Sequence, residues 1–336
     1  MRIPVPRLLP LYLIYTFSIL PVTRGEFEAK VDQYCDKFLL NNSRNCRRLT
    51  DYYLYVKPYQ SEYRLNTDKH SVRYAPFTPN VPIKIILHGF NESYRSTPNK
   101  EIRPEYLHEG YNVISADFSQ YVQYPCYRVA AYNVRILGEC FGKFLKYMLR
   151  TKVEARKIDK TDLHVIGYNL GAQIAGKGSK TLRKNNRLRR FTALDPILPI
   201  FYDEDNYVCP ECADFVDVIH TNTKMRKKLK HLGHVDFYFN NPLFTKDVSI
   251  TNPRCFTSSS PRYFGESISE VPYYRNSNAY LSGSKVIVGE WTSYETRGVY
   301  GVYTTNDSVD KYSSLPSSKK IIGVYKISNL EISDKT

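Results

Sequence analysis

Short apolar runs alternate with an amphipathic segment through the middle of the chain. Val134–Leu149 places its large apolar residues on one helical face, at Leu137, Phe141, Leu145, Met148 and Leu149. The apolar runs expected to form strands are Pro82–Leu87, Tyr111–Phe118, Leu163–Ile166, Phe191–Leu194, Phe215–Ile219 and Val235–Phe239. Because strand and helix patterns alternate, we predict an α/β fold with a mostly parallel central sheet and helices on both faces.

The flanking regions show different patterns. Residues 26–80 are polar and are expected to be irregular. Beyond residue 288, strands and turns are expected at 289–295, 298–305 and 320–328, forming an antiparallel edge of the same unit. The chain has 336 residues and shows no strong linker, so residues 26–336 are predicted to form one domain.

The first 25 residues have the pattern of a secretory signal peptide. Arg2 and Arg7 precede the apolar run Leu8–Leu20, which Pro10 interrupts and small residues around Gly25 follow. This run is short for a membrane span, which is the alternative interpretation. We therefore predict a cleaved signal at residues 1–25 and a secreted, extracellular protein.

The cysteines and glycosylation sequons fit an oxidising, extracellular setting. The seven cysteines are Cys35, Cys46, Cys126, Cys140, Cys209, Cys212 and Cys255, and most are expected to pair. Between Cys209 and Cys212 a local disulfide is favoured over a zinc half-site or a redox motif, because no second ligand pair follows. Sequons at Asn41, Asn91 and Asn306 predict N-glycosylation.

The chain is basic. Its formal net charge of +15 falls to +12 when residues 1–25 are removed, since that segment contains three arginines and no acid. Lys180–Arg190 and Lys224–Lys230 are basic runs that could bind a sulfated glycan or an anionic lipid surface, the alternative being an ordinary solvated surface. No nucleic-acid-binding motif is present, and no metal site or cofactor is predicted.

Asn169 occupies the central position of the segment with the most informative chemistry. In Val165–Gln173 an apolar strand enters a turn flanked by Gly167 and Gly171 and continues as a helix. That is the pattern of a nucleophile elbow, G-x-S-x-G, with asparagine in place of serine. A carboxamide cannot attack an ester carbonyl, so the scaffold of a serine hydrolase is predicted without its reactive atom.

Other elements of such a site are present. Asp195 ends the strand after the elbow helix, where the triad acid belongs in the order Ser, Asp, His. The main-chain N–H groups of Phe90 and Leu170 are candidates for an oxyanion hole. The histidines that follow Asp195 before residue 255 are His220, His231 and His234; the first and last are interpreted as structural and none as a convincing base.

The chain resembles the pancreatic-lipase gene family, and most closely its insect branch of lipases, phospholipases A1 and yolk proteins. The similarity covers about residues 80–305. It is carried by segments 85–90, 112–117, 163–176, 193–196, 214–221, 233–238 and 266–268, which are specific together and weak alone. The resemblance implies an α/β-hydrolase fold and a role in lipid binding or lipid metabolism.

This sequence also departs from the family pattern at several positions. The family places its histidine two residues after a cysteine, in a C-x-H-x-R stretch; here Thr257 stands at that position and Ser259 at the arginine position. Gln173 replaces the histidine usual just after the elbow. The family also has a lid cysteine between the positions of Cys212 and Cys255, and its absence implies a short lid and an unpaired Cys255.

Three functions remain open on these grounds. The first is a secreted pseudoenzyme with a broken triad at Asn169 and Thr257, which binds or stores a lipid, acyl or steroid ligand, as the yolk proteins of this family suggest. The second is an active carboxylic-ester hydrolase, a lipase or phospholipase A1, with a substitute nucleophile such as Ser258, Ser259 or Ser260. The third is a protein that binds glycans or cell surfaces through its basic runs.

Overall fold

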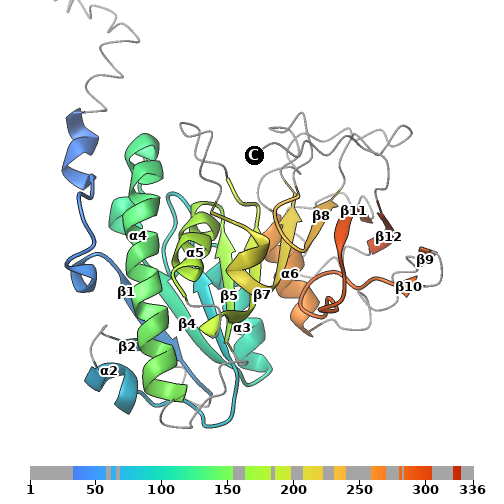
Figure 1. Cartoon of the computed structure of the whole chain (residues 1–336), viewed down its shortest axis with the longest axis horizontal. Coiled ribbons are helices and arrows are strands. Elements are labelled where there is room, and N and C mark those ends of the chain that lie inside the picture. Colours follow the sequence, from blue (N-terminus) through green and yellow to red (C-terminus); the bar gives the residue numbers. More distant parts are fainter. Residues whose placement is uncertain are drawn as a thin grey trace, which may run out of the picture.

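The computed structural model describes residues 33–57, 62–65, 69–153, 163–182, 186–197, 207–221, 231–239, 259–269, 280–281, 284–304 and 321–326. The predicted signal peptide lies outside these residues. Within them, a ten-stranded sheet dominates the architecture (Figure 1), in the order β12-β11-β8-β7-β6-β5-β3-β4-β1-β2. Its strands are β1 (Asp51–Tyr55), β2 (Tyr63–Leu65), β3 (Ile83–Leu87), β4 (Asn112–Asp117), β5 (Leu163–Tyr168), β6 (Leu188–Leu194), β7 (Ala213–His220), β8 (Val235–Phe239), β11 (Gly298–Thr304) and β12 (Ile321–Lys326).

The centre of the sheet is parallel, as predicted. Every pairing from β4 through β3, β5, β6, β7 and β8 to β11 is parallel, whereas β1, β2 and β12 are antiparallel to their neighbours. The expectation of an antiparallel edge beyond residue 288 was therefore wrong for β11 and right for β12. Helix α6 (Ser260–Ser269) separates β8 from β11 and supplies the helical crossover that parallel neighbours need. Residues 289–295 form turns rather than a strand.

Helices cover both faces of the sheet. Helices α4 (Tyr127–Met148) and α5 (Leu170–Lys180) share one core with Ile85 and Val165. On the opposite face, α3 (Asn99–His108) and α6 share a second core with Ile86 and Ile166. Neighbouring strand residues thus point into different cores, as the two-residue period of a strand requires. This arrangement is the α/β-hydrolase fold. None of the described helices is long and apolar enough to cross a bilayer.

The N-terminal region is more ordered than its polar sequence suggested. It contains β1, β2, helix α2 (Lys69–Tyr74) and two short 3₁₀ turns at Asp36–Phe38 and Cys46–Arg48. In β1 the side chains of Tyr52 and Leu54 are buried, and Tyr52 stacks on Phe144 of α4 with ring centroids 3.6 Å apart. Buried tyrosines supply the apolar surface that lets this region pack on the sheet. The prediction that residues 26–80 are irregular was therefore wrong for these elements.

Two disulfides join this N-terminal region to α4. Cys35 is bonded to Cys126 and Cys46 to Cys140, across 91 and 94 residues of sequence. Loops of that length make the constraint on the unfolded chain large, on the order of 4 kcal/mol each in the chain-entropy model. The bridges therefore fix the segment around residues 35–46 against the outer side of α4.

Candidate functional site

The turn between β5 and α5 has the geometry of a nucleophile elbow. Asn169 has φ 55° and ψ −120°, a backbone conformation that side chains rarely adopt. A Cβ atom on Gly171 would lie 2.2 Å from the main-chain oxygen of His88, and one on Gly167 would lie 2.6 Å from Cα of Ala172. Glycine at both positions therefore lets strand, turn and helix approach, as the sequence indicated.

The two predicted main-chain donors converge on a single atom. The N–H of Leu170 donates to Oδ1 of Asn169 at 2.8 Å, and the N–H of Phe90 donates to the same oxygen at 3.4 Å. The point at which an oxyanion hole would hold a substrate oxygen is thus taken by the carboxamide of the elbow residue. The assignment of Phe90 and Leu170 to an oxyanion hole stays a prediction. That the asparagine occupies the space between the two N–H groups was not predicted from the sequence.

His88 holds the turn that presents Phe90. Its Nε2 accepts a hydrogen bond from the N–H of Phe118 at 3.1 Å, so its proton is on Nδ1, which faces the Gly89 oxygen at 2.9 Å. The ring is fully buried and stacks on Phe118 at 3.9 Å. This histidine was included in the family-like sequence segment, but its positioning of the Phe90 loop was not predicted from the sequence.

Asp195, the predicted triad acid, has strong hydrogen-bond partners. Its Oδ1 accepts from the N–H of Thr221 at 2.6 Å, and its Oδ2 accepts from Oγ1 of Thr221 at 2.5 Å and from Oγ of Ser260 at 2.6 Å. Ser260 is fully buried and begins α6. The carboxylate therefore connects the ends of β6 and β7 to the first turn of α6. Thr257, the residue at the histidine position, lies outside the described residues.

His220 and His234, which follow Asp195 in the sequence, make contacts within and between β7 and β8. His220 is buried, lies 2.9 Å from Oδ1 of Asp236 through its Nε2 and stacks on Tyr238. His234 accepts a hydrogen bond from the N–H of Val216 through Nδ1 at 3.0 Å. Burial lowers the pKa of His234, which keeps the ring neutral. These contacts agree with the structural roles expected for His220 and His234.

Gln173 lies one helical turn after the elbow and is completely buried. Its Oε1 accepts a hydrogen bond from the N–H of Tyr207 at 2.9 Å, which links α5 to the chain that enters β7.

Cys209 and Cys212 lie just beyond Tyr207. Both are thiols, so the prediction of a local disulfide between them was wrong. The Cys212 thiol donates to the Tyr207 oxygen at 3.1 Å, which holds it against the chain that enters β7. No group of metal-ligating side chains occurs among the residues that the structure describes.

Two of the predicted glycosylation sites fall in described regions. Asn41 and Asn91 are both exposed, and Asn306 lies outside the described residues. Asn91 directly follows the oxyanion-hole candidate Phe90 and has φ 58°. Of the predicted basic runs, Lys224–Lys230 lies outside the described residues and Lys180–Arg190 is described except at 183–185.

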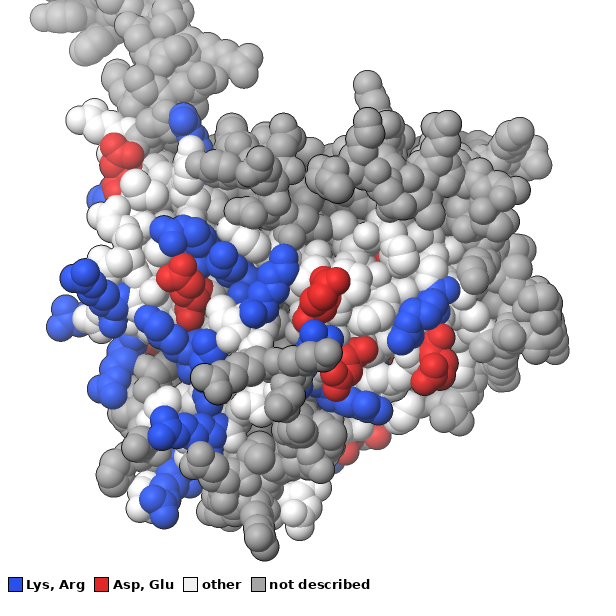
Figure 2. Space-filling view, in the orientation of Figure 1, with Lys and Arg blue, Asp and Glu red and all other residues white. Residues whose placement is uncertain are grey.

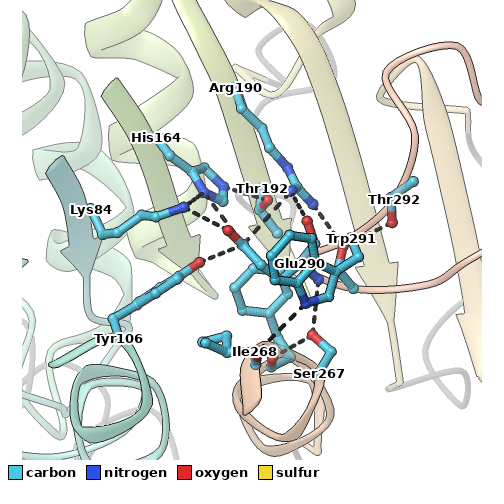
Figure 3. A network of polar contacts seen from close by, with 12 residues as sticks. Lys84, Tyr106, His164, Arg190, Thr192, Ser267, Ile268, Glu290, Trp291 and Thr292 are labelled. Carbon is cyan, nitrogen blue, oxygen red and sulfur yellow. Dashed lines mark hydrogen bonds and ion pairs between the residues drawn. The ribbon is translucent and has the colours of Figure 1, made fainter. Parts of the chain in front are cut away.

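A buried ionic network lies between the sheet and the layer of α3 and α6 (Figure 3). Lys84 of β3 reaches Oε1 of Glu290 at 2.6 Å, and the Tyr106 hydroxyl donates to Oε2 of the same carboxylate at 2.6 Å. Arg190 of β6 bonds Asp217 of β7 through two parallel hydrogen bonds of 2.9 and 2.8 Å. Two cations thus face two anions, and the arrangement cross-links three strands to the segment around Glu290.

His164 completes this network as a neutral ring. Burial, together with the charges of Lys84 and Arg190, holds the pKa of His164 well below its ordinary 6.5. Its Nε2 lies 2.8 Å from Oγ1 of Thr192, and its Nδ1 lies 3.2 Å from the Lys84 ammonium, which fixes the proton on Nε2. Burial acts to raise the pKa of Glu290, but Lys84 and Arg190 outweigh it and hold that pKa below 4.5. This cluster supports the fold and lies apart from the elbow.

The parallel sheet, the elbow at the end of β5, the acid after β6 and the two converging main-chain donors are features of the α/β-hydrolase fold. The family model for Lipase matches residues 24–248, so the chain belongs to the lipase family. It is 29% identical to pancreatic lipase-related protein 2 of Cavia porcellus over 68% of this chain and 51% of that protein.

Other relatives come from insects and mammals. The chain is 26% identical to phospholipase A1 1 of Dolichovespula maculata over 61% of this chain and 68% of that protein. It is 34% identical to lipoprotein lipase of Neovison vison over 54% of this chain and 38% of that protein. The chain thus spans about half the length of pancreatic lipase-related protein 2 and 38% of lipoprotein lipase. Among solved structures, the depolymerase LpqC of Bordetella parapertussis aligns with a TM-score of 0.32 at 11% identity, covering 69% of this chain and 82% of that one.

Proposed function

We propose that this chain is a secreted lipase-family protein that does not hydrolyse acyl esters and instead binds or stores a lipid, acyl or steroid ligand. The observation that carries the proposal is the double hydrogen bond from Leu170 and Phe90 to Oδ1 of Asn169. The Asn169 side chain thus presents two obstacles to hydrolysis. The elbow has no nucleophile, and its amide oxygen occupies the donors that would stabilise a tetrahedral intermediate.

The loss of both groups favours inactivity over slow hydrolysis. Loss of a triad serine or histidine costs on the order of 10⁶ in turnover, and the remaining 10³–10⁴ over water comes from the oxyanion hole and from binding. With Asn169 as the internal acceptor, the hole cannot supply its share of that residual rate. Thr257 at the histidine position would remove the general base as well.

A substitute nucleophile receives little support from the candidates that can be placed. Ser260 is fully buried and its hydroxyl is bonded to Asp195. The main-chain N–H of Ser259 donates to Oγ1 of Thr221 at 3.2 Å, which places the start of α6 against the Asp195 group. Ser258 lies outside the described residues. The predicted signal segment and the disulfides Cys35–Cys126 and Cys46–Cys140 support secretion.

The proposal is tested with purified protein and a serine-directed phosphonate. The natural chain is expected to hydrolyse neither short nor long acyl esters and to show no covalent labelling. The double variant Asn169→Ser/Thr257→His is expected to regain labelling, because it restores nucleophile and base and empties the oxyanion hole. Each single variant should stay unlabelled. Labelling of the natural chain at any serine would refute the proposal and support the active-hydrolase alternative.

The ligand is sought separately. An organic extract of the purified natural chain, analysed by mass spectrometry, is expected to contain a lipid in stoichiometric amount. A matched extract of the chain after unfolding and refolding in lipid-free buffer serves as the control. If both extracts lack lipid and the natural chain binds no fatty acid, acyl ester or steroid in a fluorescence displacement assay, the claim of ligand binding is wrong.

A further inference from the structure

The outward face of α4 is almost entirely basic. Six residues between 127 and 150 are exposed, and five of them are Arg128, Arg135, Lys143, Lys146 and Arg150; the sixth is Tyr132. Their spacing places them on one side of the helix, along roughly 30 Å at 1.5 Å per residue. Solvent-facing helices usually carry both signs of charge, so a stripe with five exposed cations and one partly exposed acid, Glu139, points to an anionic partner.

The disulfide-bonded N-terminal segment adds charge beside this stripe. Lys37, Arg44, Arg47 and Arg48 are all exposed in residues 33–50. The two disulfides to Cys126 and Cys140 hold this segment against α4, and Lys143 Nζ donates to the Ser43 oxygen at 2.6 Å. We call the outward faces of residues 33–50 and 127–150 the basic ridge.

Acidic residues compensate little of this charge. Within residues 33–50 and 127–150 the sequence contains nine basic residues and two acids, Asp36 and Glu139. Glu139 is engaged by Arg135 at 3.1 Å and by the Ser43 hydroxyl at 2.8 Å. Figure 2 shows this concentration of Lys and Arg over α4 and α5, whereas acidic and basic side chains are mixed toward the right of the same view. Lys177 and Lys180 of α5 extend the basic surface toward the loop around Tyr207, with which both make cation–π contacts.

We propose that the basic ridge binds a linear sulfated glycan of the glycosaminoglycan type. An elongated polyanion can follow a straight helix and neutralise several separated cations at once, releasing its counterions. Six of the nine basic residues are arginines, whose planar guanidinium forms paired hydrogen bonds with oxyanions such as sulfate.

A membrane surface fits the ridge less well. Helices that lie in a lipid interface combine their basic residues with a broad apolar face that inserts into the bilayer. The apolar face of α4 is instead packed on the sheet, with Val134, Leu137, Phe141 and Leu145 all buried. The ridge is independent of the elbow, so its binding can be tested whether or not the protein hydrolyses esters.

The test compares two variants of the full chain with the same net charge. The ridge variant is Arg47→Gln/Lys143→Gln/Lys146→Gln. The control is Arg95→Gln/Lys100→Gln/Arg262→Gln, which removes three exposed cations around α3 and α6. Binding to size-defined heparan sulfate is measured by calorimetry at several salt concentrations. Equal thermal unfolding midpoints establish that both variants are folded.

The ridge variant is expected to bind on the order of 100-fold more weakly, with the slope of log affinity against log salt reduced by roughly two to three, as for three lost phosphate contacts on a nucleic acid. The control is expected to change affinity by less than about threefold. Equal losses in both variants would overturn the proposal, since they would reflect net charge alone. It would also be overturned if the natural chain bound non-sulfated hyaluronan as tightly, or bound anionic phosphatidylserine vesicles but not heparan sulfate.

Discussion

Replacing Asp217 by asparagine should destabilise this protein far more than its small change in shape suggests. The carboxylate is fully buried and bonds Arg190 through two hydrogen bonds of 2.8 and 2.9 Å, and Arg190 itself is 3% exposed. The variant Asp217→Asn keeps the volume but removes one of the two negative charges that balance Lys84 and Arg190. Leaving a buried charge without its partner costs about 3–5 kcal/mol of folding free energy.

A second aspartate–arginine pair in the same molecule provides the control. Asp51 and Arg64 lie closer together, at 2.6 Å, but their side chains are 32% and 58% exposed. Solvent already screens this pair, so Asp51→Asn should cost no more than about 1 kcal/mol. The chemical change is identical in both variants. Burial, and not the distance between the charges, is therefore expected to set the difference.

The assay is urea unfolding with the disulfides intact, followed by far-UV circular dichroism and by the fluorescence of Trp291. This tryptophan is the only one in the chain and directly follows Glu290, so its emission reports the network region. With a urea dependence of about 1–3 kcal/mol per molar, Asp217→Asn should lower the midpoint by on the order of 2 M and Asp51→Asn by less than about 0.5 M. Equal shifts in the two variants would refute the argument from burial.

Three further outcomes are expected. The folded protein holds the pKa of His164 well below 6.5, so the free energy of unfolding should decline as the pH falls below about 6.5. The limiting slope should be near 1.4 kcal/mol per pH unit. In urea titrations at several pH values, His164→Gln should flatten that slope. Removing the Cys46–Cys140 bridge by a double alanine substitution should cost about 2–5 kcal/mol, measured against the natural chain at equal pH; an unchanged midpoint would contradict this. Gly171→Ala should reduce soluble expression sharply, because the new Cβ would lie 2.2 Å from the His88 oxygen, and a fully stable variant would show that the elbow can widen.

Much of the fold was predictable because the central strands are continuous apolar runs. β3, β4, β5 and β8 lie within two residues of their expected limits, and burial on both faces is the reason for those runs. Helices α3 and α6 were missed. Each contains a proline, at 104 and 261, and few large apolar residues, so their helical pattern is weak and packing on the sheet determines them.

In the candidate site, local backbone features were predictable and contacts between distant residues were not. The elbow and its donors were predictable, because the glycines and the strand–turn–helix pattern encode a backbone shape. The contact from Asn169 to Phe90 joins residues 79 positions apart and depends on a side-chain rotamer. The ionic network was unpredictable for the same reason, since its members are scattered between Lys84 and Glu290. Charged residues that interrupt predicted apolar strands, Lys84 in β3 and Asp217 in β7, were the visible signals of buried charge.

The carboxamide of Asn169 also changes what the turn contributes to folding. An active hydrolase keeps two main-chain donors without a protein partner so that they are ready for a reacting substrate, and such unmet groups are a cost to its resting state. Here both N–H groups already have an acceptor within the same molecule. The Asn169 side chain thus forms an internal hydrogen-bonded cap at the start of α5. Asn169→Ala should therefore make the protein less stable in urea unfolding, because it removes the acceptor of both main-chain donors.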